Sequence, residues 1–271
     1  MVGVRFSTRA GKLVRLVRTF RNWPTVLLDH LGLYRGSYVC RLRDGTSFEV
    51  RAETDDRHVL FEIYVEDIYR AEIAPGDVVV DIGANIGGFT VLAARQGARV
   101  VAFEPFPANF DALRRNVDRN GGQITLVQAA VADEGGAGKL YLPDVAAFTG
   151  RYSLHAGRGS ATVAVRCISL DDAFRDNQLD RIDFLKIDCQ GSEYQILYGA
   201  SPETLAKVKS IVVECEHFVE RLEWTTPAML RFLESQGFLT RSSGNLVWAK
   251  RVSEPPLSTA ANLGFDEAER A

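Results

Sequence analysis

The sequence has 271 residues, of which 46% are hydrophobic and 25% are charged, with a formal net charge of −3. These values are ordinary for a globular protein with a full core, and the slightly acidic balance argues against a nucleic-acid binder. The four cysteines form no Cys-x-x-Cys pair and are too few for a disulfide framework, which favours a reducing cytoplasm. No apolar run reaches the roughly 18 residues of a membrane span, and arginines interrupt the N-terminal apolar stretches, so we expect no signal peptide.

Residues 1–56 are expected to form an extension ahead of the main domain. Through residue 28, apolar residues recur at helical spacing among arginines and lysine, which predicts a basic amphipathic helix. Such a helix either caps the domain or lies at a membrane surface, where it would touch anionic lipid or a lipid-linked substrate. Two alternating runs around Asp44-Gly45 then predict a β-hairpin.

The stretch that organises the chain is residues 78–88, with the sequence VVVDIGANIGG. Its apolar, β-branched start predicts a strand buried on both faces, and residues 89–95 follow as a helix. The glycines would let the backbone approach a ligand closely, and the helix N-terminus offers free N–H groups. The same pattern also fits a tight turn that binds nothing.

Residues 99–103 predict a second buried strand, which ends at Glu104. An acid about 20 residues beyond the glycine turn accepts hydrogen bonds from ribose hydroxyls in nucleotide-binding βαβ units. Pro105 would stop the strand behind it. Glu104 is therefore a candidate ligand for a ribose.

The turn itself distinguishes between two kinds of cofactor. Three residues separate Gly83 from Gly87, so the spacing does not fit the Gly-x-Gly-x-x-Gly pattern of a dinucleotide site. Asp81, at the end of the first strand, would repel a pyrophosphate but would suit an ammonium group. S-adenosylmethionine (SAM) carries a ribose, an amino-acid head and no phosphate, so the pattern favours SAM.

The remaining elements alternate between strands and helices. They predict an α/β fold with a mostly parallel sheet, helices on both faces and a terminal hairpin. Residues 57–250 would form this domain, and residues 251–271 a mobile tail. The expected helices are 61–69, 107–120, 169–177, 191–198 and 227–236, and the expected strands are 124–131, 139–142, 161–165, 182–188, 210–216, 238–242 and 245–249.

Four blocks in order resemble the FkbM-type family of SAM-dependent methyltransferases. The first three are residues 81–87 (DIGANIG), 103–105 (FEP) and 109–110 (NF). The fourth, residues 185–193 (LKIDCQGSE), is similar to the family's Lys-x-Asp-x-Glu-Gly-x-Glu signature. The likeness covers roughly residues 57–216. It departs at Gln190, which stands where the family often has Glu.

The resemblance implies a Rossmann-like class I methyltransferase fold with a seven-stranded sheet, and SAM as cofactor. It also implies O-methylation of a hydroxyl on a sugar, glycan or natural product, so we expect a small-molecule or glycan acceptor and no nucleic acid. No Asn/Asp-Pro-Pro-Tyr motif for amino methylation is present. Two alternatives stay open, namely an NAD-type dinucleotide-dependent oxidoreductase and a SAM-binding protein without catalysis.

The cofactor site is expected along the strand ends. Asp81 would meet the methionine head, Glu104 the ribose, and the stretch from Ala130 to Asp133 the adenine. The segment before the first core strand would cover the cofactor, with Tyr64, Glu66 and Tyr69 as candidate lining residues. The full set of expected cofactor residues is Asp81, Gly83, Asn85, Gly87, Glu104, Asn109, Ala130 and Asp133.

A hydroxyl acceptor needs its proton removed by a base or by a metal that lowers its pKa. His217 directly follows the fifth expected core strand and titrates near neutrality, so it is the candidate base. Asp188 ends the fourth and would orient the cofactor amine, hold the acceptor or serve as the base. Asp188 and Glu214 could bind Mg²⁺, but no Asp-Asp or Asp-Asn dipeptide supports this, so we expect no metal. Lys186 and Glu193 are expected to form a structural ion pair beneath the site.

Overall fold

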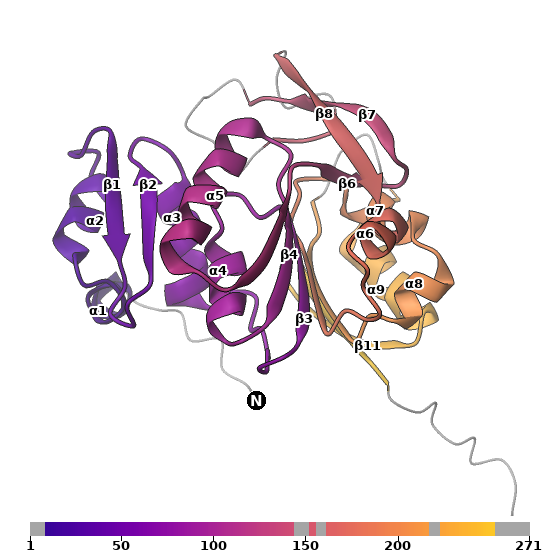
Figure 1. Ribbon diagram of the computed structural model, residues 1–271. Helices are drawn as coiled ribbons and strands as arrows, with labels where there is room; N and C mark the ends of the chain where they lie inside the picture. Colours follow the sequence, from indigo (N-terminus) through magenta and orange to yellow (C-terminus); the bar gives the residue numbers. More distant parts are fainter. Residues whose placement is uncertain (1–8, 144–151, 156–160, 217–222, 253–271) are drawn as a thin grey trace, which may run out of the picture.

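The computed structural model describes residues 9–143, 152–155, 161–216 and 223–252 (Figure 1). The expected tail from residue 253 onward lies outside these ranges. The helices are α1 (Arg9–Thr19), α2 (Trp23–His30), α3 (Asp56–Phe61), the π-helix η1 (Glu62–Glu66), α4 (Gly88–Arg95), α5 (Pro107–Asn120), α6 (Leu170–Asp176), α7 (Glu193–Gly199), α8 (Pro202–Ala206) and α9 (Thr226–Ser235). The strands are β1 (Ser37–Arg41), β2 (Ser47–Arg51), β3 (Val78–Ile82), β4 (Arg99–Phe103), β5 (Gln123–Val127), β6 (Ala130–Ala132), β7 (Gly136–Tyr141), β8 (Thr162–Ser169), β9 (Phe184–Ile187), β10 (Ser210–Glu214), β11 (Phe238–Ser243) and β12 (Leu246–Arg251).

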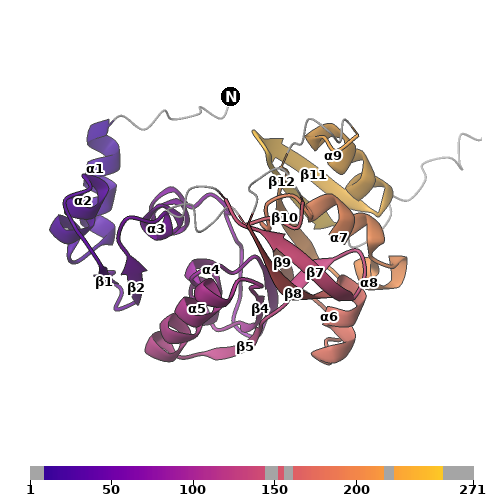
Figure 2. The same ribbon diagram turned by 90° about the horizontal axis from the view of Figure 1, so that it is seen from above.

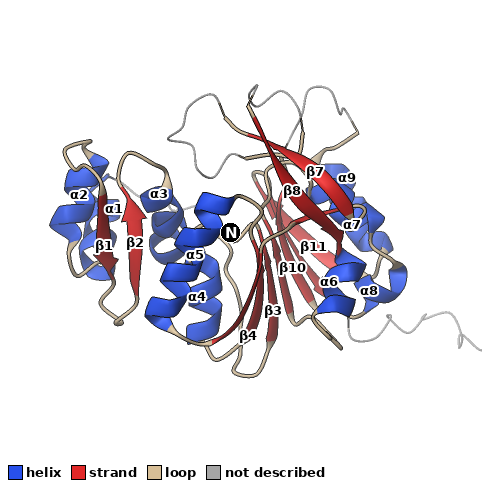
Figure 3. Cartoon of the chain, turned by 45° about the horizontal axis from the view of Figure 1, so that its top comes forward, coloured by secondary structure: helices blue, strands red, loops and turns tan. Residues whose placement is uncertain are grey.

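The core is a seven-stranded sheet in the order β11-β12-β10-β9-β3-β4-β5. In this sheet β12 alone runs opposite to the other six strands, because it returns from β11 as a hairpin and inserts beside β10. Helices α4 and α5 cover one face, and α6 to α9 cover the other (Figure 3). Neighbouring valines divide between the faces, as strand geometry requires: Val80 joins the cluster under α6, α7 and α9, and Val79 packs with α4. The expected α/β architecture is confirmed.

The N-terminal extension lies beside α4 and α5, at the left of Figure 1. The basic helix expected here forms as α1, and the chain breaks before a second helix, α2. Pro24 starts α2, where its missing N–H costs no hydrogen bond. Asn22, at the break, donates to Val39 O and accepts from Arg41 N, which ties the break to β1. No helix in the described ranges is long and apolar enough to cross a bilayer.

Two asparagines of α5 join the expected hairpin to the core. Asn116 accepts a hydrogen bond from Glu49 N at 2.7 Å and donates to Ile86 O at 2.9 Å. Asn120 accepts from Ser47 N at 3.0 Å and donates to Ser47 O at 2.8 Å. These amides satisfy backbone groups of β2 that would otherwise lack partners at a sheet edge. The hairpin is therefore fixed against α5.

The segment expected to be mostly helical over residues 61–69 forms the end of α3 and then η1. A π-helix is rare and occurs frequently at functional sites. Tyr64 in η1 donates to Gly88 O at 3.1 Å, which holds the segment against the start of α4. The segment ends at Asp67, whose φ of 50° is left-handed. From above, α3 lies between the N-terminal hairpin and the main sheet (Figure 2).

The third core strand expected over residues 124–131 is divided in two. Strand β5 is at the edge of the main sheet, and the chain then turns at Gln128 and Ala129. Strand β6 pairs instead with β8, which also pairs with β7 in a separate three-stranded sheet. The expected insertion thus forms a small sheet of its own, seen above the core in Figure 1.

Candidate active site

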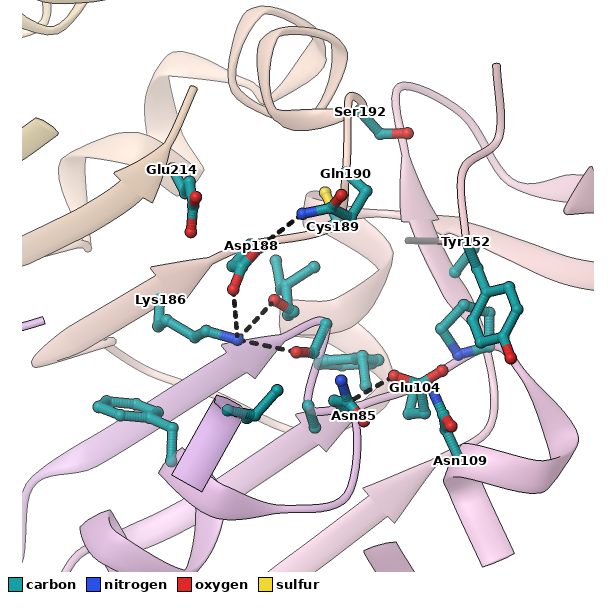
Figure 4. A pocket seen from close by; sticks show the side chains of 18 of the residues that line it. Asn85, Glu104, Asn109, Tyr152, Lys186, Asp188, Cys189, Gln190, Ser192 and Glu214 are labelled. Carbon is teal, nitrogen blue, oxygen red and sulfur yellow. Dashed lines mark hydrogen bonds and ion pairs between the residues drawn. The ribbon is translucent and has the colours of Figure 1, made fainter. Parts of the chain in front are cut away.

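A cavity of about 670 Å³ opens at the carboxyl ends of the core strands, the edge where open α/β sheets bind ligands (Figure 4). Strands β3, β4, β9 and β10 place Gly83, Glu104, Asp188 and Glu214 on its wall. The segment of α3 and η1 forms another side, and the small sheet closes the cavity with Leu140. Three parts of the sequence therefore form one site.

Glu104 directly follows β4 and points into the cavity. Its Oε2 accepts the N–H of Asn85 at 2.8 Å, and its Oε1 accepts the N–H of Phe106 at 2.9 Å. Burial raises the pKa of Glu104 to about 7, against the lowering effect of these two N–H donors. A carboxylate held in this way can still accept hydrogen bonds from a diol on its open side.

The glycine turn after β3 approaches the end of β9 closely. Gly83 has φ of 80°, and a Cβ there would lie 1.8 Å from the carbonyl oxygen of Asp188. Asn85 has φ of 52°, and its buried Oδ1 has no hydrogen-bond partner among the described residues. An unpartnered amide oxygen on a cavity wall is suited to a ligand donor. Gly87 is not part of the wall and instead begins α4 with φ of 92°.

Asp81 does not reach the cavity. Its side chain is 0% exposed and accepts from Thr90 Oγ1 at 2.6 Å. Lys186 Nζ lies 3.0 Å from Asp81 Oδ1 and donates to Gly83 O at 2.8 Å. The structure therefore places the ammonium group of Lys186, and not the cavity, beside the Asp81 carboxylate. Burial opposes the charge on Lys186, but Asp81 and Asp188 together outweigh it and raise the lysine pKa.

The expected ion pair between Lys186 and Glu193 is also wrong. Glu193 begins α7 and its Oε1 accepts the N–H groups of Cys189 at 3.2 Å and Gly191 at 2.9 Å. Burial raises the pKa of Glu193 to about 7. Glu193 thus fixes the loop after β9 through hydrogen bonds to its backbone. Lys186 pairs instead with Asp81 on β3. Gln190, in this loop, has φ of 59°.

Two carboxylates stand at the end of the cavity near Lys186. Asp188 Oδ2 accepts from the Tyr69 hydroxyl at 2.7 Å and lies 4.0 Å from Lys186 Nζ. Glu214 Oε1 accepts from Asn245 Nδ2 at 3.0 Å. The negative charge of Asp188, followed by burial, raises the pKa of Glu214 to about 8. The two acids therefore repel each other when both are ionised.

The other expected site residues divide into three groups. Asn109 and Ala130 are on the cavity wall, and Asn109 Oδ1 accepts from Arg51 Nη2 at 2.8 Å. Asp133 is exposed and outside the wall, because β6 leaves the main sheet and carries it away. His217, the candidate base, lies outside the described residues.

Several wall residues were not singled out from the sequence. They come from the segment of α3 and η1 and from the short stretch around residue 153, where no motif marks them. Tyr69, expected as a lining residue, is on the wall, whereas Tyr64 and Glu66 are not. The position of the segment ahead of the first core strand was the only signal. The additional polar and aromatic wall residues include Thr54, Asp55, Arg57, His58, Glu62 and Tyr152.

The fold and the site together define an α/β protein with a cavity at the strand ends, lined by a glycine turn and a buried acid. The family model "Methyltransferase FkbM domain" matches residues 81–240 of the chain. The chain belongs to this family of methyltransferases, which use SAM as the methyl donor. The expected family and cofactor are confirmed.

Named relatives agree with this assignment. The chain is 30% identical over 203 residues to 31-O-demethyl-FK506 methyltransferase FkbM of Streptomyces tacrolimicus, covering 63% of this chain and 78% of that protein. It is 27% identical over 240 residues to methyltransferase sdnD of Sordaria araneosa, covering 76% and 90%. It is 29% identical over 176 residues to hexuronic acid methyltransferase AglP of Haloferax volcanii, covering 65% of each chain.

Proposed function

We propose that this methyltransferase transfers a methyl group from SAM to a hydroxyl group of a sugar, glycan or natural product. The observation that carries the proposal is the convergence of Glu104, the turn at Gly83 and the acid Asp188 on one cavity. The names of two relatives, one acting on 31-O-demethyl-FK506 and one on hexuronic acid, support acceptors of this kind.

The cavity wall fits the donor. Glu104 would accept hydrogen bonds from the ribose hydroxyls, and Asn85 Oδ1 would take a further donor from the ligand. Ala130, at the start of β6, would offer an apolar contact to the adenine ring. SAM supplies a methyl group that its sulfonium charge already activates. The protein therefore has to align the acceptor and remove its proton.

Asp188 is the described residue best placed to act on the acceptor. Its Oδ2 accepts from Tyr69, while its Oδ1 has only a long contact of 3.5 Å to Gln190 Nε2. Oδ1 would hold the acceptor hydroxyl and take its proton as the C–O bond forms, while the electrons of the S–CH₃ bond remain on sulfur. His217, which directly follows the wall residue Glu216 in the sequence, stays a proposed base.

The N-terminal helices offer a second contact. On α1, Leu13 and Val14 are 47% and 49% exposed and Arg18 is also exposed. We propose that this basic, apolar surface touches anionic lipid or a lipid-linked acceptor. Co-sedimentation with phosphatidylglycerol vesicles but not with phosphatidylcholine vesicles is the expected result. Equal binding to both, or to neither, would contradict it.

Methyl-labelled SAM with a panel of acceptors tests the reaction. The panel should contain neutral sugars, hexuronates, nucleotide sugars and macrolides that lack a methyl ether. Product labelled on oxygen is the expected outcome. Asp188→Asn should then lower kcat by roughly 10²-fold or more while the Kd for SAM stays near that of the wild type. Calorimetry that detects NAD binding and no SAM binding would overturn the proposal.

A further inference from the structure

The two acids at the end of the cavity come from neighbouring strands at equal height. Ile187 on β9 pairs in register with Val213 on β10, so the residues that follow them, Asp188 and Glu214, are side by side. Adjacent strands are about 4.8 Å apart, which keeps the two carboxylates within range of strong repulsion. Both residues are on the cavity wall, as Figure 4 shows.

The hydrogen-bond donors around the pair are unequally divided. Asp188 accepts from the Tyr69 hydroxyl at 2.7 Å and has the ammonium group of Lys186 4.0 Å away. Glu214 Oε1 accepts from the neutral amide of Asn245, and its Oε2 receives no hydrogen bond from the residues that the structure describes. A shared proton would therefore reside mainly on Glu214.

Two further acids act on Glu214. Glu62 on η1 and Glu216 beyond β10 both act to keep a proton on Glu214, after the larger effects of Asp188 and burial. Together these effects raise the pKa of Glu214 to about 8. In the free protein at neutral pH, the pair thus carries one proton and one negative charge.

We propose that Asp188 and Glu214 form a charge-sensing pair, which releases its proton when a sulfonium binds beside it and so distinguishes SAM from the uncharged product S-adenosylhomocysteine. This inference rests on the proposed use of SAM by this cavity. The strand order β10-β9-β3-β4 puts the pair on the opposite side of the glycine turn from Glu104. A ligand whose ribose contacts Glu104 and whose chain crosses Gly83 extends toward the pair.

The protonation of the pair should differ before and after methyl transfer. A cation within about 4–6 Å favours ionised carboxyl groups, so the proton leaves the Glu214 carboxyl for bulk water as the donor binds. The pair is then fully ionised while the acceptor hydroxyl must lose its proton. Methyl transfer removes the positive charge, so the proton that Asp188 takes from the acceptor stays on the pair, and the attraction of the pair for the product weakens.

Isothermal titration calorimetry with SAM and with S-adenosylhomocysteine tests the proposal without any acceptor. Each ligand is titrated at about pH 7.5 in two buffers with different ionisation enthalpies, which yields the number of protons released. SAM is expected to release about half a proton more than S-adenosylhomocysteine. Glu104 contributes equally to both titrations, because both ligands carry the ribose, and it cancels in the difference.

Variants locate the effect. Glu214→Gln should abolish the difference in proton release and reduce the preference for SAM by about three- to tenfold. Glu216→Gln, which removes only one of the weaker charges that act on Glu214, should reduce the difference without abolishing it. Equal proton release by the two ligands in the wild type overturns the proposal, whatever the variants do. SAM binding with equal release leaves the proposed function standing, whereas no SAM binding overturns both.

Discussion

Lys186 Nζ lies 3.0 Å from Asp81 Oδ1, and the two side chains are 4% and 0% exposed. The residues are register partners on neighbouring strands, so their side chains share one face of the sheet. Because Lys186 also donates to Gly83 O at 2.8 Å, the pair anchors the glycine turn from below. The pair therefore supports the cavity wall at Gly83, although Asp81 itself does not line the cavity.

Asp81→Asn should destabilise the fold as well as weaken SAM binding. The change leaves the Lys186 ammonium buried without its closest carboxylate, which costs about 3–5 kcal/mol of unfolding free energy. Denaturant titration followed by calorimetry with SAM measures both effects. In the double variant Asp81→Asn, Lys186→Met, part of the lost stability should return, because no buried charge remains unpaired. Unchanged stability with weakened SAM binding would instead point to direct contact between Asp81 and the cofactor.

Gly83→Ala should prevent normal folding of the cavity, for a steric reason within the protein. Its Cβ would lie 1.8 Å from Asp188 O, so β3 and β9 could not both keep their positions. Gly76 is a matched control, since its φ of 86° is similar but a Cβ there meets nothing within 4 Å. Gly76→Ala should cost only about 1–2 kcal/mol. Thermal melts of both variants measure the contrast, and equal losses would show that backbone strain alone matters.

Glu104→Gln should raise the Kd for SAM by roughly 10- to 100-fold, because hydrogen bonds from the ribose to a charged acceptor are replaced by weaker ones. Folding should be little affected, since the amide oxygen can still accept one of the two backbone N–H groups. The affinity of the wild type for SAM should increase as the pH rises through about 7, where Glu104 ionises. Calorimetry at several pH values checks this. A Kd that is the same in the variant would exclude Glu104 as the ribose ligand.

The stability of the free protein should fall as the pH rises from about 4.5 to 8. Glu104 and Glu193 have pKa values raised to about 7 and Glu214 to about 8, against 4.5 for the ordinary group. In this window the folded state binds more protons than the unfolded state, so these groups stabilise the fold at low pH and lose that effect on ionisation. Urea titrations at half-unit steps should show the decline, and Glu193→Gln should flatten it. A rise in stability across the window would contradict these pKa shifts.

Much of the fold could be predicted from local patterns. The run VVVDIG and the acid at Glu104 identify a buried strand, its turn and the next strand end, because burial on both faces leaves a continuous apolar signal. The hairpin at Asp44-Gly45 is similarly local, and the capping box of Ser169 with Asp172 marks the start of α6.

What could not be predicted depended on register and on distant partners. The partner of Asp81 is 105 positions further along the chain, and only the pairing of β3 with β9 brings Lys186 beside it. The alternation of side chains along β3 puts Asp81 on the sheet face that α4 covers. Asp81, which was expected to contact the ligand at the end of the strand, is therefore buried in the core. The departure of β6 from the main sheet, which places Asp133 outside the cavity wall, could not be predicted because the turn at Gln128 and Ala129 lacks a glycine or proline.

The segment of α3 and η1 has a practical consequence. The shared family region begins at residue 81, yet Asp55, His58, Glu62 and Tyr69 on the cavity wall all precede it. A truncated protein that starts at β3 would retain every strand of the central sheet and still leave the pocket open on one side. Exchange of this short segment between family members should therefore change one side of the pocket while Glu104 and the glycine turn stay as they are.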